Sequence, residues 1–283
     1  MTLVACMCNQ PDRLAEALAP LPLALPAPIG RWGLASVHGG EVLIARTPRP
    51  ADGPLDLATA IAEQRSDCVI AQIVDDDRGP PRSLPLGGED LPPFRFRRWM
   101  LAADPTAAMD ARTFEQMIAR VPEFLRRNLR GRSVGELTLH TLIALLYEQG
   151  LTDDAGLAMP ALARITVEAI AVVTDGLRRA APAAIDVAVA DVSFANLAVS
   201  NSRALAVAAI AAPLSVYPLR VFTERGAHDP SFRGVLVASG LPAPIRKPDL
   251  SEPMPEHVPV GSLVTVTRDL QVAIAPLPQR ASL

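Results

Sequence analysis

The order of strand-like and helix-like segments constrains the fold of this chain more than any other feature. Short apolar runs with strand character dominate the first hundred residues, amphipathic helical patterns fill residues 112–180, and strand-like runs return from residue 185. A parallel sheet needs helices that alternate with its strands, whereas strands grouped apart from the helices favour antiparallel pairing. The sequence therefore predicts an α+β fold built on antiparallel sheets.

The first hundred residues predict several strands and one short helix. Residues 2–8 form an apolar run that suits a buried strand. Two apolar segments, 32–38 and 41–46, flank Gly39-Gly40, which is a strong hairpin signal. Further strands are expected over 67–74 and 97–102, a short helix over 55–64, and loops over the Pro-rich segments 20–28 and 75–93.

The middle of the chain predicts three helical segments. Apolar residues fall on one face of a helix over 112–129, and Pro122 should kink this helix or divide it in two. Ser133 is a plausible N-cap for the next helix, with Glu136 at the spacing of a capping box. The third helix is expected over 158–180.

The last hundred residues return to strand character. Strands are expected over 185–199, 203–210, 234–238, 262–267 and 271–275, with a long loop over 240–260. We find neither internal repeats nor a clear linker, so we expect residues 1–283 to form a single domain.

Composition excludes several classes of protein. The 283 residues are 49% hydrophobic and 20% charged, which is typical of a globular chain. The net charge of -3 gives no basic excess to attract nucleic acid or an anionic membrane. Three cysteines, Cys6, Cys8 and Cys68, neither form a disulfide framework nor have zinc-binding spacing. We therefore expect a soluble cytoplasmic protein without metal, cofactor, nucleic acid or membrane partner.

Six segments, which follow one another along the chain in the family's order, resemble sequence motifs of the class II glutamine amidotransferases. The stretch from Arg31 to Pro50 resembles the family's GWG…PRP sequence, and 196–201 resembles its NLAVTDG strand and turn. The other four segments are 66–71, 93–99, 131–136, and 237–239 with 258–259. The resemblance extends to about residue 277, and it is closest to free-standing amidotransferase-like hydrolases, including those that cleave γ-glutamyl amides in ergothioneine synthesis.

This resemblance implies the N-terminal-nucleophile hydrolase fold, a four-layer α/β/β/α sandwich of two antiparallel sheets. It also implies a mechanism in which a residue freed at the N-terminus attacks the amide carbon and its own α-amine acts as the base. An Asn side chain and a Gly N–H stabilise the oxyanion. An Arg and an Asp then hold the α-carboxylate and the α-ammonium of glutamine.

The family's nucleophile, a cysteine at position 2, corresponds to Thr2 in this chain. Threonine is small enough for Met1 to be removed, and threonine with a free amine serves as a nucleophile elsewhere in this fold. Thr2 is therefore the candidate nucleophile. The alternative is that Thr2 is only the first residue of a buried strand.

The other family motifs are replaced. The His-Asn-Gly turn corresponds to Ala103-Asp104-Pro105, where proline lacks the N–H donor and Asp104 adds a negative charge. Loss of one oxyanion donor costs roughly 100- to 1000-fold in rate. The His-x-Arg motif corresponds to 72–74, and the Asp of Asp-Ser-Glu corresponds to Val134, so a bound zwitterion would lack both counter-charges. The remnant pocket should comprise Thr2, Gln72, Val74, Ala103, Asp104, Pro105 and Val134.

We therefore expect a class II amidotransferase-like protein that has lost glutaminase activity and binds a protein partner or a small amide-like ligand. The rival hypothesis is an active amidohydrolase that uses Thr2 on a non-glutamine amide. A third hypothesis is a conventional glutamine amidotransferase whose site aligns differently. A homo-oligomer is compatible with all three.

Two charged clusters have simpler explanations than binding sites. Asp75-Asp76-Asp77 is expected to be solvated surface rather than a cation site. Arg95, Arg97 and Arg98 could bind an anion, but alternation along one strand explains them more simply, and this alternation puts Phe96 and Trp99 on different faces.

Overall fold

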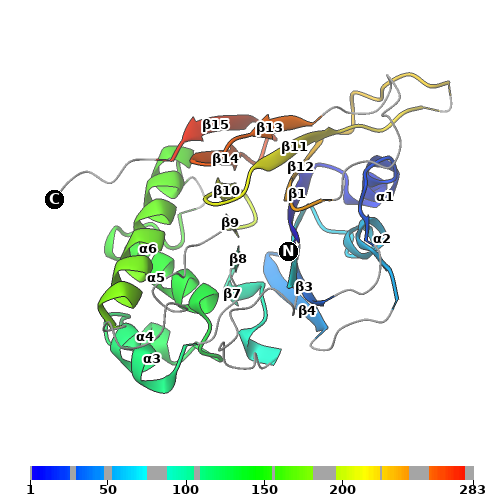
Figure 1. The fold of residues 1–283 in the computed structure, drawn as a ribbon. Helices are drawn as coiled ribbons and strands as arrows, with labels where there is room; N and C mark the ends of the chain where they lie inside the picture. Colours follow the sequence, from blue (N-terminus) through cyan, green and yellow to red (C-terminus); the bar gives the residue numbers. More distant parts are fainter. Residues whose placement is uncertain are drawn as a thin grey trace.

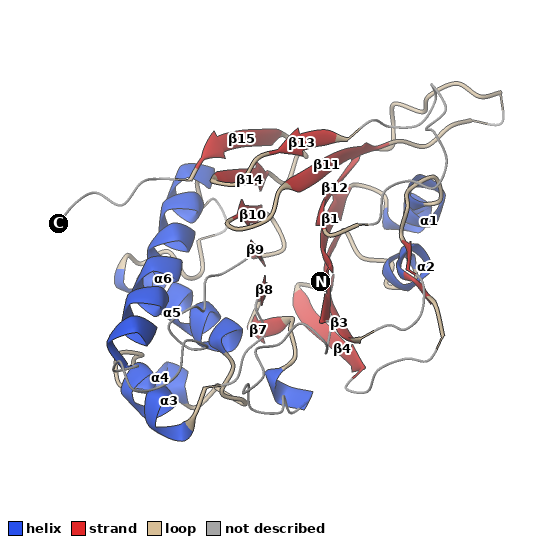
Figure 2. Ribbon diagram, viewed as in Figure 1, coloured by secondary structure: helices blue, strands red, loops and turns tan. Residues whose placement is uncertain are grey.

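The structure is a computed structural model, which describes residues 2–25, 30–47, 53–74, 88–104, 109–154, 157–180, 196–223, 225–241 and 255–277, with the backbone alone at Asp104. Two large antiparallel sheets lie face to face, and helices cover the outer face of each (Figure 1 and Figure 2). The layers follow the order α/β/β/α. This arrangement confirms the predicted α+β class and its four-layer sandwich.

Within the described residues, sheet 1 has seven strands. Its order is β13 (Glu256–Val258), β11 (Leu214–Leu219), β12 (Gly234–Ser239), β1 (Thr2–Cys8), β6 (Cys68–Val74), β3 (Arg31–His38) and β4 (Glu41–Thr47). A separate two-stranded sheet pairs β2 (Ala24–Leu25) with β5 (Leu55–Asp56).

Sheet 2 has six strands. Its order is β15 (Val272–Pro276), β14 (Ser262–Val266), β10 (Leu205–Ala209), β9 (Asn196–Ser200), β8 (Trp99–Asp104) and β7 (Phe94–Phe96). The strand β7 therefore forms one edge of sheet 2, as β4 forms one edge of sheet 1.

The helices divide into two groups. The helices α1 (Leu14–Leu18) and α2 (Leu57–Ala62) lie outside sheet 1 (Figure 2). Outside sheet 2 lie α3 (Ala111–Ile118), α4 (Glu123–Arg126), α5 (Val134–Glu148) and α6 (Met159–Ala180). Among the helices of the described residues, none is both long and apolar enough to cross a bilayer.

Three apolar clusters fill the spaces between the four layers. Leu3, Ala5 and Met7 of β1 belong to the cluster between the two sheets. Val4 and Cys6 belong to the cluster between sheet 1 and α1 and α2. A third cluster lies between sheet 2 and α5 and α6. Strand alternation thus explains why β1 is apolar on both faces: both faces are covered.

Local sequence signals position several of these elements as predicted. Gly39 and Gly40 have φ angles of 58° and 87°, which the tight β3–β4 hairpin requires and which glycine adopts without strain. Pro122 separates α3 from α4. The Ser133 hydroxyl accepts a hydrogen bond from the Glu136 N–H at 3.2 Å, so Ser133 caps α5.

Two features of the region around residue 97 differ from the sequence prediction. Of the strand expected over 97–102, residues 99–102 lie in β8, whereas Arg97 and Arg98 form the turn between β7 and β8. Phe96 and Trp99 are direct cross-strand partners and share a face, which contradicts the alternation predicted for a single strand. Arg97 has a φ of 51°, a turn conformation for which no glycine or asparagine gave a signal.

Further elements lie where loops were expected or no element was predicted. These include α1 and β11, β2 within the segment 20–28, and β13 within the segment 240–260. Of the strand expected over 185–199, the structure describes β9 only, and the acidic run 75–77 lies outside the described residues.

Candidate functional site

Thr2, the candidate nucleophile, is the first described residue of β1 and is buried. It pairs with Ile73 of β6 and shares the face of sheet 1 that Val4 and Ile73 present to α1 and α2. Its hydroxyl donates a hydrogen bond to the Gly240 carbonyl at 3.0 Å. The Thr2 hydroxyl therefore already donates a hydrogen bond to the residue that follows β12.

Gln72 lies on the opposite face of sheet 1, because it pairs with Leu3 rather than with Thr2. It is 1% exposed, and its Nε2 donates to the Ala103 carbonyl at 3.0 Å. Ala103 belongs to β8 in sheet 2, so this hydrogen bond joins the two sheets. Gln72 stands where the resemblance puts the first residue of the His-x-Arg motif.

Val74 and Val134 stand where the resemblance puts the substrate-binding Arg and Asp. Val74, at the end of β6, is 4% exposed, and Val134, the first residue of α5, is 1% exposed. Val134 contributes to the apolar cluster between sheet 2 and its helices. Neither position offers a charge to a bound amino acid.

The region of the expected oxyanion hole is described only in part. Ala103 is buried on β8, and the backbone of Asp104 pairs with Asn196 of β9. The Asp104 side chain and Pro105 lie outside the described residues. Whether the seven residues of the remnant pocket together bind a ligand stays a prediction.

The three cysteines are unsuited to replace Thr2 as nucleophiles. Burial raises the pKa of each thiol, to about 12 for Cys8 and for Cys68. Their reactive thiolate form is therefore scarce near neutral pH. Among the described residues, no group of three or more His, Cys, Asp or Glu side chains is placed to hold a metal ion.

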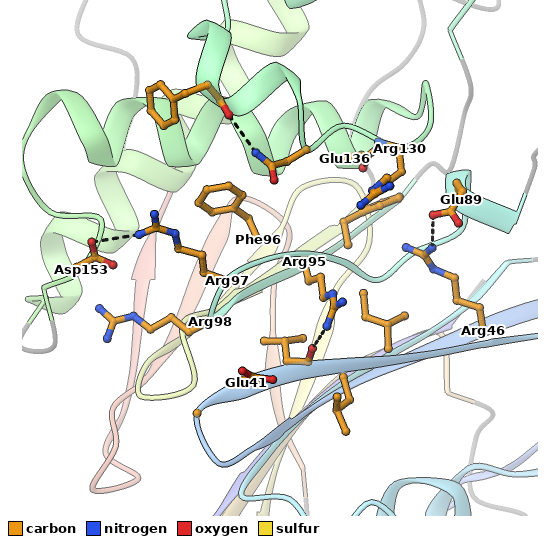
Figure 3. A pocket seen from close by; sticks show the side chains of 17 residues that line it. Glu41, Arg46, Glu89, Arg95, Phe96, Arg97, Arg98, Arg130, Glu136 and Asp153 are labelled. Atoms are coloured by element: carbon orange, nitrogen blue, oxygen red, sulfur yellow. Dashed lines mark hydrogen bonds and ion pairs between the residues drawn. The ribbon is translucent and has the colours of Figure 1, made fainter.

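A large cleft opens where the edges of the two sheets meet the helices of sheet 2 (Figure 3). It has a volume of about 1280 Å³. Its walls come from β4, from the β7–β8 hairpin and from residues of α4 and α5 with the loop between them. The cleft walls include Phe94, Phe96 and Arg46, and they do not include the described residues of the remnant pocket, which are Thr2, Gln72, Val74, Ala103 and Val134.

Glu136 has the most perturbed environment of the cleft residues. It is 5% exposed, and its two carboxylate oxygens accept hydrogen bonds from the N–H groups of Arg130 and Gly131 at 2.9 and 2.8 Å. Burial raises its pKa to about 7, although these hydrogen bonds and the nearby Arg46 favour the charged form. The predicted capping box therefore forms only in part: Glu136 binds the loop before the helix.

Arg46 connects β4 to the start of β7. Its guanidinium donates to the carbonyls of Gly88 and Pro93 at 3.3 and 2.8 Å and pairs with Glu89 at 3.3 Å. It also lies 5.7 Å from the centroid of the Phe94 ring. Burial lowers the pKa of Arg46, and Glu89 and Glu136 oppose this shift. Sequence reasoning missed this cleft because its walls come from distant segments.

Two solved structures have the same architecture as this chain. A glutamine aminotransferase class-II domain protein from Silicibacter pomeroyi superposes with a TM-score of 0.54 at 17% identity, covering 99% of this chain and 100% of that one. The chain has the class II glutamine amidotransferase fold. An allosteric regulatory enzyme of purine biosynthesis superposes with a TM-score of 0.50 at 10% identity, covering 99% of this chain and 50% of that chain.

At these identities, the similarity to the solved structures shows the class II amidotransferase fold alone. No protein-family model matches the sequence, and no curated protein matches it significantly. The chain spans the full length of the Silicibacter protein and half the length of the purine-biosynthesis enzyme.

Proposed function

We propose that this chain is a class II amidotransferase-like protein that binds a ligand or partner without hydrolysing glutamine. One observation carries the proposal: the positions expected to hold the charged groups of glutamine contain the buried Val74 and Val134. Burying an amino acid zwitterion against two apolar side chains leaves both charges without partners, at a cost of several kcal/mol. Neither side chain can form an ion pair with the substrate.

The position of Gln72 supports the same proposal. Its side-chain amide is hydrogen-bonded to Ala103 across the gap between the sheets, and it is almost fully buried. A ligand that entered between β6 and β8 would have to break this bond. The polar group at the motif position therefore serves the contact between the sheets.

The test is a glutaminase assay on the full chain and on the variant Thr2→Cys, with release of glutamate and ammonia as the readout. Cysteine restores the nucleophile that the family uses but leaves Val74 and Val134 in place. We expect neither protein to release glutamate. Turnover of about one per second or faster by either protein, in the usual range for enzymes, would overturn the proposal.

The rival function is amide hydrolysis by Thr2 on a substrate other than glutamine. The position of Thr2 at the start of β1 favours it, because removal of Met1 would give Thr2 the free α-amine that the mechanism needs. Intact-mass measurement checks whether Met1 is removed, and peptide mapping after treatment with an amide-mimicking electrophile checks whether Thr2 reacts. Retained Met1 rules out this rival function, whereas covalent labelling at Thr2 would establish a reactive nucleophile.

A further inference from the structure

The cleft between the sheet edges is rich in arginine. Five guanidinium groups line it, from Arg46, Arg95, Arg97, Arg98 and Arg130. They come from β4, from the β7–β8 hairpin and from the loop before α5. In Figure 3, Arg46, Arg95 and Arg97 follow one another across the cleft, with Arg98 beside Arg97.

Four acidic residues also line the cleft, and three of them already have partners. Glu89 pairs with Arg46 at 3.3 Å, and Asp153 pairs with Arg97 at 3.4 Å. Glu136 binds two backbone N–H groups, and its raised pKa, about 7, means that it is partly protonated near neutral pH. The remaining acid is Glu41. The described part of the cleft wall therefore has a net positive charge.

Arg98 has hydrogen-bonding capacity that the described residues do not use. Its Nε and Nη2 atoms are buried and have no hydrogen-bond partner. These two atoms form one edge of the guanidinium group, and their parallel N–H bonds match the two oxygens of a carboxylate or a phosphate. Burying such donors without an acceptor is costly. An anion would satisfy both at once.

The position of Arg98 allows this edge to reach a ligand. Arg98 lies in the turn between β7 and β8, and it is only half-buried as a residue. We expect that a change of its side-chain rotamer, without movement of either strand, lets this edge meet an anion in the cleft. The Nε of Arg46 is a further buried donor that has no hydrogen-bond partner among the described residues.

Exposed apolar side chains stand at the same cleft. Leu43 of β4 is 49% exposed and Phe124 of α4 is 45% exposed, and both belong to the cleft wall. The Phe124 ring lies 4.8 Å from that of Tyr147, which is also exposed. Arginines beside exposed apolar groups suit a ligand that has an anionic end and an apolar body.

We infer that this cleft binds a small organic anion, with a carboxylate or phosphate group held by Arg98 and its neighbouring arginines and an apolar body against Phe124 and Leu43. The site is separate from Thr2, Gln72, Val74 and Val134. It does not depend on whether Thr2 is reactive, so it stands or falls apart from the proposed function.

The experiment is calorimetric titration of the full chain with four probes. Phenyl phosphate and benzoate carry an anion and a ring, inorganic phosphate lacks the ring, and benzyl alcohol lacks the charge. We expect phenyl phosphate or benzoate to bind with a Kd below about 1 mM. Inorganic phosphate should bind more weakly and benzyl alcohol should not bind. The tighter aromatic anion identifies the head group. Failure of both aromatic anions to bind at that level would overturn the inference.

Three variants locate the binding. Arg98→Gln should weaken the aromatic anion by about tenfold or more, since it removes a charged hydrogen-bond donor pair. The matched control is Arg220→Gln, which replaces an exposed arginine beyond β11, far along sheet 1 from β4. It should bind like the wild type. Equal affinity of Arg98→Gln and the wild type would contradict the assigned site.

Phe124→Ala tests the apolar part and does not disturb the core, because Phe124 is exposed. It should weaken phenyl phosphate or benzoate and leave inorganic phosphate unchanged. If Arg98→Gln does not fold, Phe124→Ala still tests whether the anion binds in the cleft. Unchanged affinity of Phe124→Ala for the aromatic anion would exclude the cleft as the binding site.

Discussion

At the scale of single residues, Glu136 is a buried carboxyl group whose surroundings stabilise its charged form only in part. Two backbone N–H groups and the nearby Arg46 favour its carboxylate, whereas burial and the nearby Asp90 favour the protonated form. Burial is the largest of these effects, so the pKa rises to about 7. The loop before α5 is thus held by a group that changes charge near neutral pH.

This raised pKa predicts a dependence of stability on pH. A carboxyl group whose pKa is higher in the folded state stabilises the fold fully below its unfolded pKa, and this contribution is lost as the pH rises through the folded pKa. For Glu136 this stabilisation is lost between the usual pKa of 4.5 and the folded-state pKa of about 7. Relative to Glu136→Gln, which does not titrate, the free energy of unfolding should fall by about 2–3 kcal/mol between about pH 5 and about pH 8.

Denaturant unfolding of both proteins across this pH interval measures the effect. Taking the difference removes the contribution of titrating groups that are common to both proteins. A difference that stays constant with pH would mean that Glu136 is charged throughout and that its hydrogen bonds outweigh its burial.

At the scale of elements, β3 lies unusually close to the segment that leads into β7. A Cβ atom on Gly33 would be 2.2 Å from the Pro92 carbonyl oxygen and 3.1 Å from Pro93 Cδ. Backbone atoms cannot move aside as a flexible side chain can. Gly33 therefore permits an approach between sheet 1 and the chain entering sheet 2 that no other residue type would allow.

We expect Gly33→Ala to lower the free energy of unfolding by about 3 kcal/mol, because the contact forces one of the two segments to shift. Thermal or denaturant unfolding measures this. Gly53→Ala is the control, since a Cβ atom there meets nothing within 4 Å, and it should change stability by less than about 0.5 kcal/mol. Similar losses in both variants would mean that the close approach is not the cause, because Gly→Ala by itself lowers the entropy of the unfolded chain and thereby favours folding.

The elements that could be predicted from sequence are those whose signal is local. The β3–β4 hairpin follows from Gly39-Gly40, and α5 follows from Ser133 and the apolar pattern after it. The strand β11 was missed because it contains Pro218, which the fold tolerates beyond the residues that pair with β13. The β7–β8 turn was missed because Arg97 carries no turn signal.

The site was less predictable than the fold. Gln72, Val74 and Val134 were identified by resemblance, but only tertiary structure shows that Gln72 contacts Ala103 in the other sheet. The arginine cleft joins β4, the β7–β8 hairpin and α5, which are separated by up to about a hundred residues in sequence. No periodicity or motif links such segments, so Arg95, Arg97 and Arg98 were explained by alternation along one strand.

At the scale of the whole molecule, each sheet contains strands from both sides of the helical segment. Sheet 1 joins β1, β3, β4 and β6 to β11, β12 and β13, and sheet 2 joins β7 and β8 to β9, β10, β14 and β15. The cluster between the sheets accordingly combines residues from both parts of the chain, such as Ala5 and Val237. Neither part contains a complete large sheet.

We therefore predict that a fragment of residues 1–180 does not fold, although it contains α1 to α6. Without β9–β15, α5 and α6 lose most of the sheet on which they pack, and sheet 1 loses three of its seven strands. NMR chemical-shift dispersion and the cooperativity of thermal unfolding measure the outcome. A dispersed spectrum with a sharp transition would contradict the expectation that residues 1–283 form one domain.

The central place of β1 in sheet 1 also bears on how the protein is made. On the ribosome, β1 emerges before the other strands of sheet 1 and can pair with β6 once that strand follows, yet its other edge faces β12, where Leu3 pairs with Ser239. Until that strand is synthesised, an apolar strand with free backbone groups is left open to other nascent chains. Translation speed and chaperone supply should therefore affect the yield of this protein.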